Sequence, residues 1–193
     1  MNNIYSKTTR IIHELWGQGN PDKASLSTLR STKSINDPKA NLIWPYLFNT
    51  LEKDDLSRTG RPTFAENAVY TALQAYAILQ QSNDRPSFGK TKVFNALSQL
   101  RQDEHVQKGL DRRAQIIFGN NTYDSLTKAL LQLIHLLKSH HKTAQLDFGQ
   151  LAQDLYYFQF NRELARKITL KWGQQYYWID RKKPVTEKDS TTD

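Results

Sequence analysis

The chain has 193 residues, 38% of them hydrophobic, and carries a formal net charge of +8 with a sequence pI near 9.6. The absence of cysteine excludes disulfides, thiolate zinc sites and thiol nucleophiles. The basic excess favours a polyanionic partner, of which nucleic acid is the commonest. Because there is no secretion signal and no apolar run of about 20 residues, we expect a cytoplasmic protein without membrane contact.

The first part of the chain carries helix signals at close intervals. Residues 8–16 predict a short amphipathic helix that ends at Gly17. In Asn20-Pro21-Asp22 we expect a cap, a proline at the first helical position and an acid in the first turn of a second helix. Residues 38–51 predict a third helical segment, which Pro45 kinks or restarts.

The middle of the chain alternates between polar connections and apolar helices. Residues 51–62 are charged and contain glycine, which predicts a loop. Residues 64–81 are rich in alanine and other helix formers, which indicates a helix that approaches its neighbours closely. Ser87 is the expected cap of a helix over residues 88–100, and Gly109 is expected to divide the charged stretch that follows.

The broadest apolar pattern lies in residues 126–158, where leucine recurs at helical spacing on both sides of a basic turn. We interpret it as a hairpin of two helices that forms the core of the C-terminal lobe. His140 and His141 then lie at the carboxyl end of its first helix, and Asp147 caps its second helix. A last helix over residues 161–178 follows.

These patterns predict an all-α fold, since no alternating run bounded by hairpin turns is present. We expect a helical bundle of about eight or nine helices in two lobes, formed by residues 1–82 and residues 87–180. The basic end of the chain, residues 181–193, has no apolar content to bury, so we expect a disordered tail.

Candidate catalytic and metal-binding groups do not converge in the sequence. The five histidines are isolated or adjacent, and adjacent helical residues point about 100° apart, which disfavours a shared metal. Asp54 and Asp55 lie in a polar stretch, where we expect them to be solvated. Asp147 and Asp154 share one side of a helix, but a nuclease metal needs a third ligand and none is evident. We therefore expect no enzymatic activity, no metal and no cofactor.

Basic residues recur at helix starts and turns, where they suit contacts with a phosphate backbone. This set comprises Lys23, Arg30, Lys33, Lys90, Lys92, Arg101, Arg112, Arg113, Lys138, Lys142, Arg162, Arg166, Lys167 and Lys171. Ordinary solubilising charge is the alternative interpretation, because acids such as Asp111 neutralise part of the set.

Aromatic residues favour packing over stacking on bases. Trp16, Trp44, Trp172 and Tyr176 all fall on apolar helix faces, so we expect them in the core. The sequence does not assign the other tyrosines to one of these roles, and some of them suit a protein interface.

Several short phrases occur in a fixed order between residues 12 and 178. They are Leu15-Trp16, Asp22-Lys23-Ala24 with Leu26, Leu29 and Arg30, Trp44-Pro45, Ala65 to Gln74, Ser87-Phe88-Gly89 with Leu97, Arg112-Arg113, Leu133 to Lys138, Leu146-Asp147-Phe148 with Leu151 and Asp154-Leu155, and Trp172 with Tyr176-Tyr177. In this order and spacing the chain resembles the small subunit of the type I-E CRISPR surveillance complex, the CasB family of Cascade.

The resemblance implies an all-helical, non-catalytic protein that is present as two copies in a CRISPR RNA-guided antiviral complex. Its implied partners are the crRNA and target DNA, the backbone and large subunits, and the second copy of itself. The implied role is to support the crRNA–target arrangement and to hold the displaced DNA strand of the R-loop on a basic surface. The residues that match as nucleic-acid contacts are Arg30, Lys90, Arg101, Arg112, Arg113, Lys138 and Arg162.

The chain departs from the family pattern at two places in the expected hairpin. Phe158 stands where relatives commonly have tryptophan, and Ile134-His135 stands where some relatives have arginines. The second departure puts in question a direct role of this helix in the basic groove. Two alternative functions are a purely structural interaction subunit without nucleic-acid contact and a small metal-dependent nuclease.

Overall fold

The computed structural model describes residues 3–120 and 122–178. Over these residues the fold is all-α apart from one short strand and two 3-10 turns, which confirms the predicted class, and none of the helices is long and apolar enough to cross a bilayer. The predicted tail of residues 181–193 lies outside the described residues. The elements are α1 (Ile4–Trp16), η1 (Gly17–Gly19), α2 (Lys23–Ser31), η2 (Pro38–Leu42), α3 (Trp44–Thr50), α4 (Phe64–Gln80), β1 (Phe88–Thr91), α5 (Val93–Leu100), α6 (Glu104–Gly119), α7 (Tyr123–His140), α8 (Phe148–Phe158) and α9 (Arg162–Tyr177).

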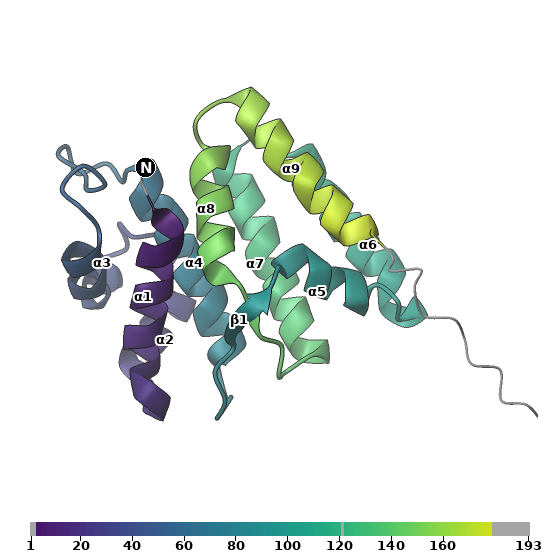
Figure 1. Ribbon diagram of the computed structural model, residues 1–193, viewed down its shortest axis with the longest axis horizontal. Coiled ribbons are helices and arrows are strands. Elements are labelled where there is room, and N and C mark those ends of the chain that lie inside the picture. Colours follow the sequence, from purple (N-terminus) through teal and green to yellow (C-terminus); the bar gives the residue numbers. More distant parts are fainter. Residues whose placement is uncertain (1–2, 121, 179–193) are drawn as a thin grey trace, which may run out of the picture.

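The core is built around α4. Every residue from 65 to 80 except Asn67 is buried, and the alanines along the helix allow α1, α2, α7 and α8 to pack closely on it. Figure 1 shows α8 and α7 beside α4. The predicted pair of helices in residues 126–158 is α7 and α8, and both pack against α4; each is buried mainly on one side, whereas α4 is buried nearly all round.

The other helices lie at the two ends of this central group. The short helices α2 and α3 accompany α1 at one end, and α5, α6 and α9 pack together at the other (Figure 1). The buried hydrophobic residues form one cluster that includes side chains from both ends. The division into lobes of residues 1–82 and 87–180 stays a prediction.

The starts of two helices differ from the prediction. Asp22 is itself the N-cap of α2, accepting a hydrogen bond from the backbone N–H of Ser25, so Pro21 lies before the helix. Ser87 does not cap α5, because its carbonyl accepts the N–H of Leu146 and leads the chain into β1. Ser87 therefore takes part in a long-range backbone hydrogen bond and not in a helix cap.

Gly109 does not divide the chain, since α6 runs through it without a break. A glycine inside a helix costs about 1 kcal/mol relative to alanine. Burial of Leu110, Ala114 and Ile117 on one face of α6 outweighs that cost.

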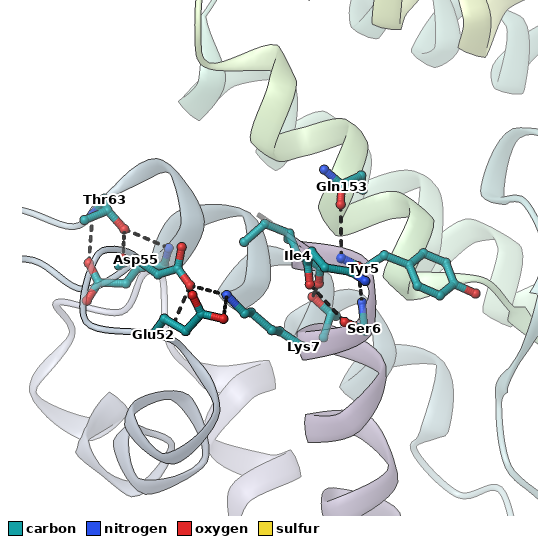
Figure 2. A network of polar contacts seen from close by, with 11 residues as sticks. Ile4, Tyr5, Ser6, Lys7, Glu52, Asp55, Thr63 and Gln153 are labelled. Carbon is teal, nitrogen blue, oxygen red and sulfur yellow. Dashed lines mark hydrogen bonds and ion pairs between the residues drawn. The ribbon is translucent and has the colours of Figure 1, made fainter. Parts of the chain in front are cut away.

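A buried polar network attaches the loop after α3 to α1 and α4 (Figure 2). Asp55, only 2% exposed, accepts a hydrogen bond from Lys7 Nζ at 2.7 Å, and Glu52 Oε1 lies 3.0 Å from the same ammonium. Thr63, the N-cap of α4, donates its hydroxyl proton to the carbonyl of Asp55. The prediction of a solvated carboxylate is wrong for Asp55, because the fold brings Lys7 onto it. Burial lowers the pKa of Lys7, but its hydrogen bonds to the two carboxylates outweigh burial and raise it overall.

We expect Asp55→Ala to lower the free energy of unfolding by about 3 kcal/mol, because Lys7, with 11% of its side chain exposed, then loses its buried partner. Asp54→Ala is the matched control on the adjacent residue. Asp54 is 91% exposed, so its loss changes the free energy by only about 0.5 kcal/mol. Urea unfolding near pH 7 measures both, and equal losses would contradict the assignment.

Candidate nucleic-acid interface

The carboxyl end of α4 collects cationic side chains from other elements. Arg30 on α2 donates from Nη1 to the carbonyl of Ala77 at 3.1 Å. Lys138 on α7 donates from Nζ to the carbonyls of Ile78 at 2.7 Å and Gln81 at 2.5 Å. These are the carbonyls that a helix leaves without partners, at the negative end of its dipole.

Two further lysines belong to this region, one near Lys138 and one in a hollow that Arg30 also lines. Lys142, in the turn after α7, is exposed and close enough to Lys138 to repel its charge. Lys23, at the start of α2, is exposed and lines a hollow together with Arg30. We call these four residues, Lys23, Arg30, Lys138 and Lys142, the α4-terminal cluster. Among residues 3–120 and 122–178, none of the four forms an ion pair with a carboxylate.

The pKa values of the groups at this site are shifted by burial and by the proximity of their charges. Burial, together with repulsion from Arg30 and Lys142, lowers the pKa of Lys138 to about 8. Burial also lowers the pKa of Arg30. Burial and the charge of Lys138 lower the pKa of His135, one turn earlier on α7. The site is therefore electropositive and short of negative charge.

The hollow next to the cluster is polar and has a volume of about 510 Å³. Amides and hydroxyls from the segment after α4 line it, with Asp84 as its one acid among the described residues and Trp16 at one margin. The lining residues are Trp16, Gly19, Asn20, Pro21, Lys23, Leu26, Arg30, Gln80, Gln81, Ser82, Asn83 and Asp84.

Arg101, another expected contact, is engaged inside the protein. Its guanidinium makes two hydrogen bonds to Asp111, at 2.7 and 3.2 Å, and lies 5.2 Å from the ring centre of Tyr177. Asp111 also accepts the hydroxyl proton of Tyr176 at 2.6 Å. Arg101 therefore links α6 to α9 through Asp111, with two of its five N–H donors used and its charge paired with a carboxylate.

The other expected contacts are exposed but lie on separate elements. Arg112 and Arg113 are on α6, where Arg113 Nη1 donates to the carbonyl of Gly109 at 3.0 Å. Lys90 lies on β1 and Arg162 at the start of α9. The structure thus brings together Arg30 and Lys138 from the expected set, while the other five are distributed over the molecule.

The two acids considered for a nuclease site serve structural roles. Asp147 caps α8, as predicted, by accepting the N–H of Gln150 at 2.9 Å. Asp154 is 4% exposed and accepts hydrogen bonds from Lys171, Trp172 and Gln150. Within the described residues, no group of three or more histidine, aspartate or glutamate side chains is arranged to hold a metal ion.

Residues 25–177 match the family described as CRISPR-associated protein Cse2. The chain belongs to this family. It is a CasB-family small subunit of a Cascade complex, as the ordered phrases in its sequence predicted. No curated protein matched the chain.

Two solved structures have the same fold as this Cse2-family chain. CasB from Thermobifida fusca is 24% identical, with a TM-score of 0.66, and the match covers 91% of this chain and 96% of that one. A Cse2-family CRISPR-associated protein from Thermus thermophilus is 20% identical, with a TM-score of 0.67, and the match covers 90% of this chain and 97% of that one. The helical arrangement is thus shared over nearly the full length of both.

Sequence reasoning on this Cse2-family chain did not find that Arg30 and Lys138 meet at α4. One signal was available: α4 has no basic residue in its last turn, and the residue that follows it, Gln81, is not a glycine. Such a helix end needs donors from other elements, and the long basic side chains are the ones with sufficient reach.

We expect Lys138→Met to raise the pKa of His135, because the variant removes the charge that, together with burial, lowers it. The titration of the His135 ring protons by NMR measures this change. Lys128→Met, an exposed lysine on the same helix, is the matched control and leaves the pKa of His135 unchanged. A pKa that is equal in wild type and Lys138→Met would contradict the proximity of the two residues.

Proposed function

We propose that this chain is a non-catalytic subunit of a type I-E Cascade complex that contacts nucleic acid through the α4-terminal cluster. In this role it holds the displaced DNA strand beside the crRNA–target duplex and stabilises the R-loop. The observation that carries the proposal is that Arg30, Lys138 and Lys142 lie together at the end of α4, next to a polar hollow that Arg30 shares with Lys23. None of the four forms an ion pair with a carboxylate within the described residues.

The cluster retains donors for phosphate after its internal bonds are made. A guanidinium has five N–H donors and an ammonium has three, whereas Arg30 spends one donor on α4 and Lys138 spends two. Lys23 and Lys142 are exposed and add further ammonium groups. Contacts of this kind bind a phosphate backbone irrespective of sequence, which suits a displaced strand of any sequence.

A purely structural interaction subunit is the second candidate, and one observation favours it. Leu42, Trp44 and Phe48 are 46%, 40% and 45% exposed at the α2–α3 end of the molecule. Trp44 and Phe48 border an apolar hollow of about 590 Å³. Such a surface suits a protein neighbour, such as a backbone subunit, the large subunit or a second copy of this chain. Both roles are compatible in one complex.

We expect Lys23→Ala with Lys142→Ala to weaken binding of single-stranded DNA and to reduce the slope of log affinity against log salt by about 2, one for each lost phosphate contact. Fluorescence anisotropy at several salt concentrations measures both. Lys53→Ala with Arg58→Ala removes the same charge from the loop attached to the start of α1, away from the cluster. An equal loss in both double variants would indicate net charge alone, and an affinity independent of salt would reject the electrostatic site.

We expect Arg112→Ala with Arg113→Ala to leave the fold intact, since both side chains are exposed, and to weaken target binding by the assembled complex by about tenfold. R-loop lifetime on target DNA measures the effect. Arg112→Lys with Arg113→Lys retains the charge and most of the binding. Unchanged R-loop lifetime in the alanine variant would remove these two residues from the interface.

A further inference from the structure

A third hollow, of about 930 Å³, lies between α1 and β1 and is bordered by aromatic rings. The ring centres of His13 and Phe88 are 4.5 Å apart at 55°, and the edge of Trp16 faces Phe88 at 6.3 Å. Tyr5, 39% exposed, lines the same hollow nearer the start of α1. The walls of this hollow therefore offer rings to whatever enters it.

The local structure explains why these rings face the hollow. Arg10, His13 and Trp16 are spaced three residues apart, so they share one face of α1, while Ile11, Ile12 and Leu15 point to the core. On the other wall, Gly89 lies against Gln145, where a Cβ would come within 2.8 Å of the Gln145 side chain. This close approach of Gly89 to Gln145 positions β1 from the side that faces away from the hollow.

Side chains alternate along a strand, so Phe88 and Lys90 share the face of β1 opposite to Gly89. Phe88 on this face contacts His13 and Trp16 of α1. Lys90, one of the basic residues expected to contact nucleic acid, is exposed and is thereby placed on the same side as the rings.

Core packing covers these aromatic rings only in part. His13 is exposed, while Trp16 and Phe88 are half-buried, so part of each ring surface faces the hollow. The sequence-based expectation that Trp16 packs in the core holds only for part of its side chain. Half-exposed rings in a concave site are the usual platform on which unpaired bases stack.

The chemistry of the hollow favours a nucleotide over an apolar peptide. Between the rings stand charged and polar side chains, including Arg10, which pairs with Glu14 at 3.0 Å. Most of the exposed lining of the hollow is apolar, with these polar groups in between, and a nucleotide matches this combination because it has a flat base beside a charged backbone. Trp16 also lines the polar hollow of Lys23 and Arg30, so the aromatic and basic sites adjoin.

We propose that the α1–β1 hollow stacks unpaired bases of a nucleic-acid strand whose phosphates lie on the adjoining α4-terminal cluster. This inference rests on the proposed function and adds to it a base-binding subsite. Stacking on His13, Trp16 and Phe88 accepts any base, because every base has a flat aromatic face.

The test compares an oligothymidine with an abasic tetrahydrofuran oligomer of the same length, bound to the full-length protein at low salt. Both carry the same phosphates and only the first can stack. We expect the wild type to prefer the oligothymidine by about tenfold. In His13→Ala with Trp16→Leu we expect the two oligomers to bind about equally, because only the affinity for the oligothymidine falls. The slope of log affinity against log salt stays unchanged. Trp178→Leu, the same substitution at a tryptophan that is 74% exposed at the end of α9, retains the preference.

The other outcomes overturn the inference in distinguishable ways. Equal, salt-sensitive binding of both oligomers by the wild type rejects stacking and leaves the phosphate site standing. A preference that persists in His13→Ala with Trp16→Leu places the stacked base elsewhere. If the wild type binds neither oligomer, the proposed function fails and the subsite with it. Should Trp16→Leu prevent folding, His13→Ala alone, on an exposed residue, gives the same comparison.

Discussion

A helix that is buried on every side cannot leave the carbonyl groups of its last turn to water, and α4 is buried along nearly its whole length. Its sequence offers no basic residue in the last turn and no left-handed glycine after it. The donors come instead from Asn83, whose side-chain amide binds the carbonyl of Leu79, and from Arg30 and Lys138. The positions of α2 and α7 against the end of α4 depend on these bonds.

The amino end of α4 has the opposite electrostatic character. Thr63 and Glu66 form a reciprocal capping box there, and Asp55 lies next to it. At this end Lys7 pairs with Asp55 and Glu52, and the carboxylate of Glu66 accepts the backbone N–H groups of Ser57 and Thr63, so the acidic groups are engaged within the protein. At the carboxyl end the cations have carbonyl groups but, within residues 3–120 and 122–178, no carboxylate partners. The two ends of one helix thus separate a structural network from a surface that can receive an anion.

Local features of the fold could be predicted from the sequence, and features that depend on distant contacts could not. The span of α4, the start of α7 after Thr122 and the cap at Asp147 follow from patterns within a few residues. The pair of Lys7 with Asp55 joins residues 48 apart, and the bond of Lys138 to Ile78 joins residues 60 apart. The periodicity of apolar residues along the chain carries no information on contacts between residues that are so far apart in the sequence.

The same division holds for the candidate site. Resemblance to the family identified the basic residues that match its pattern, but not which of them the fold uses internally. Arg101 looked as available as Arg112 until Asp111 and Tyr176 were seen to enclose it. Conversely, Trp16 and Trp44 looked like core residues, because an apolar helix face does not reveal whether another element covers it.

The lowered pKa of Lys138 has a thermodynamic consequence for any strand that binds beside it. Bringing several like charges together is unfavourable, and here that cost is incurred when the chain folds, since the carbonyls of α4 hold Arg30 and Lys138 in place. An arriving phosphate then meets a site in which neither side chain has to be ordered and in which its own charge relieves an existing repulsion. Burial and mutual repulsion disfavour the charged form of Lys138 in the empty protein, and a bound anion would offset both effects.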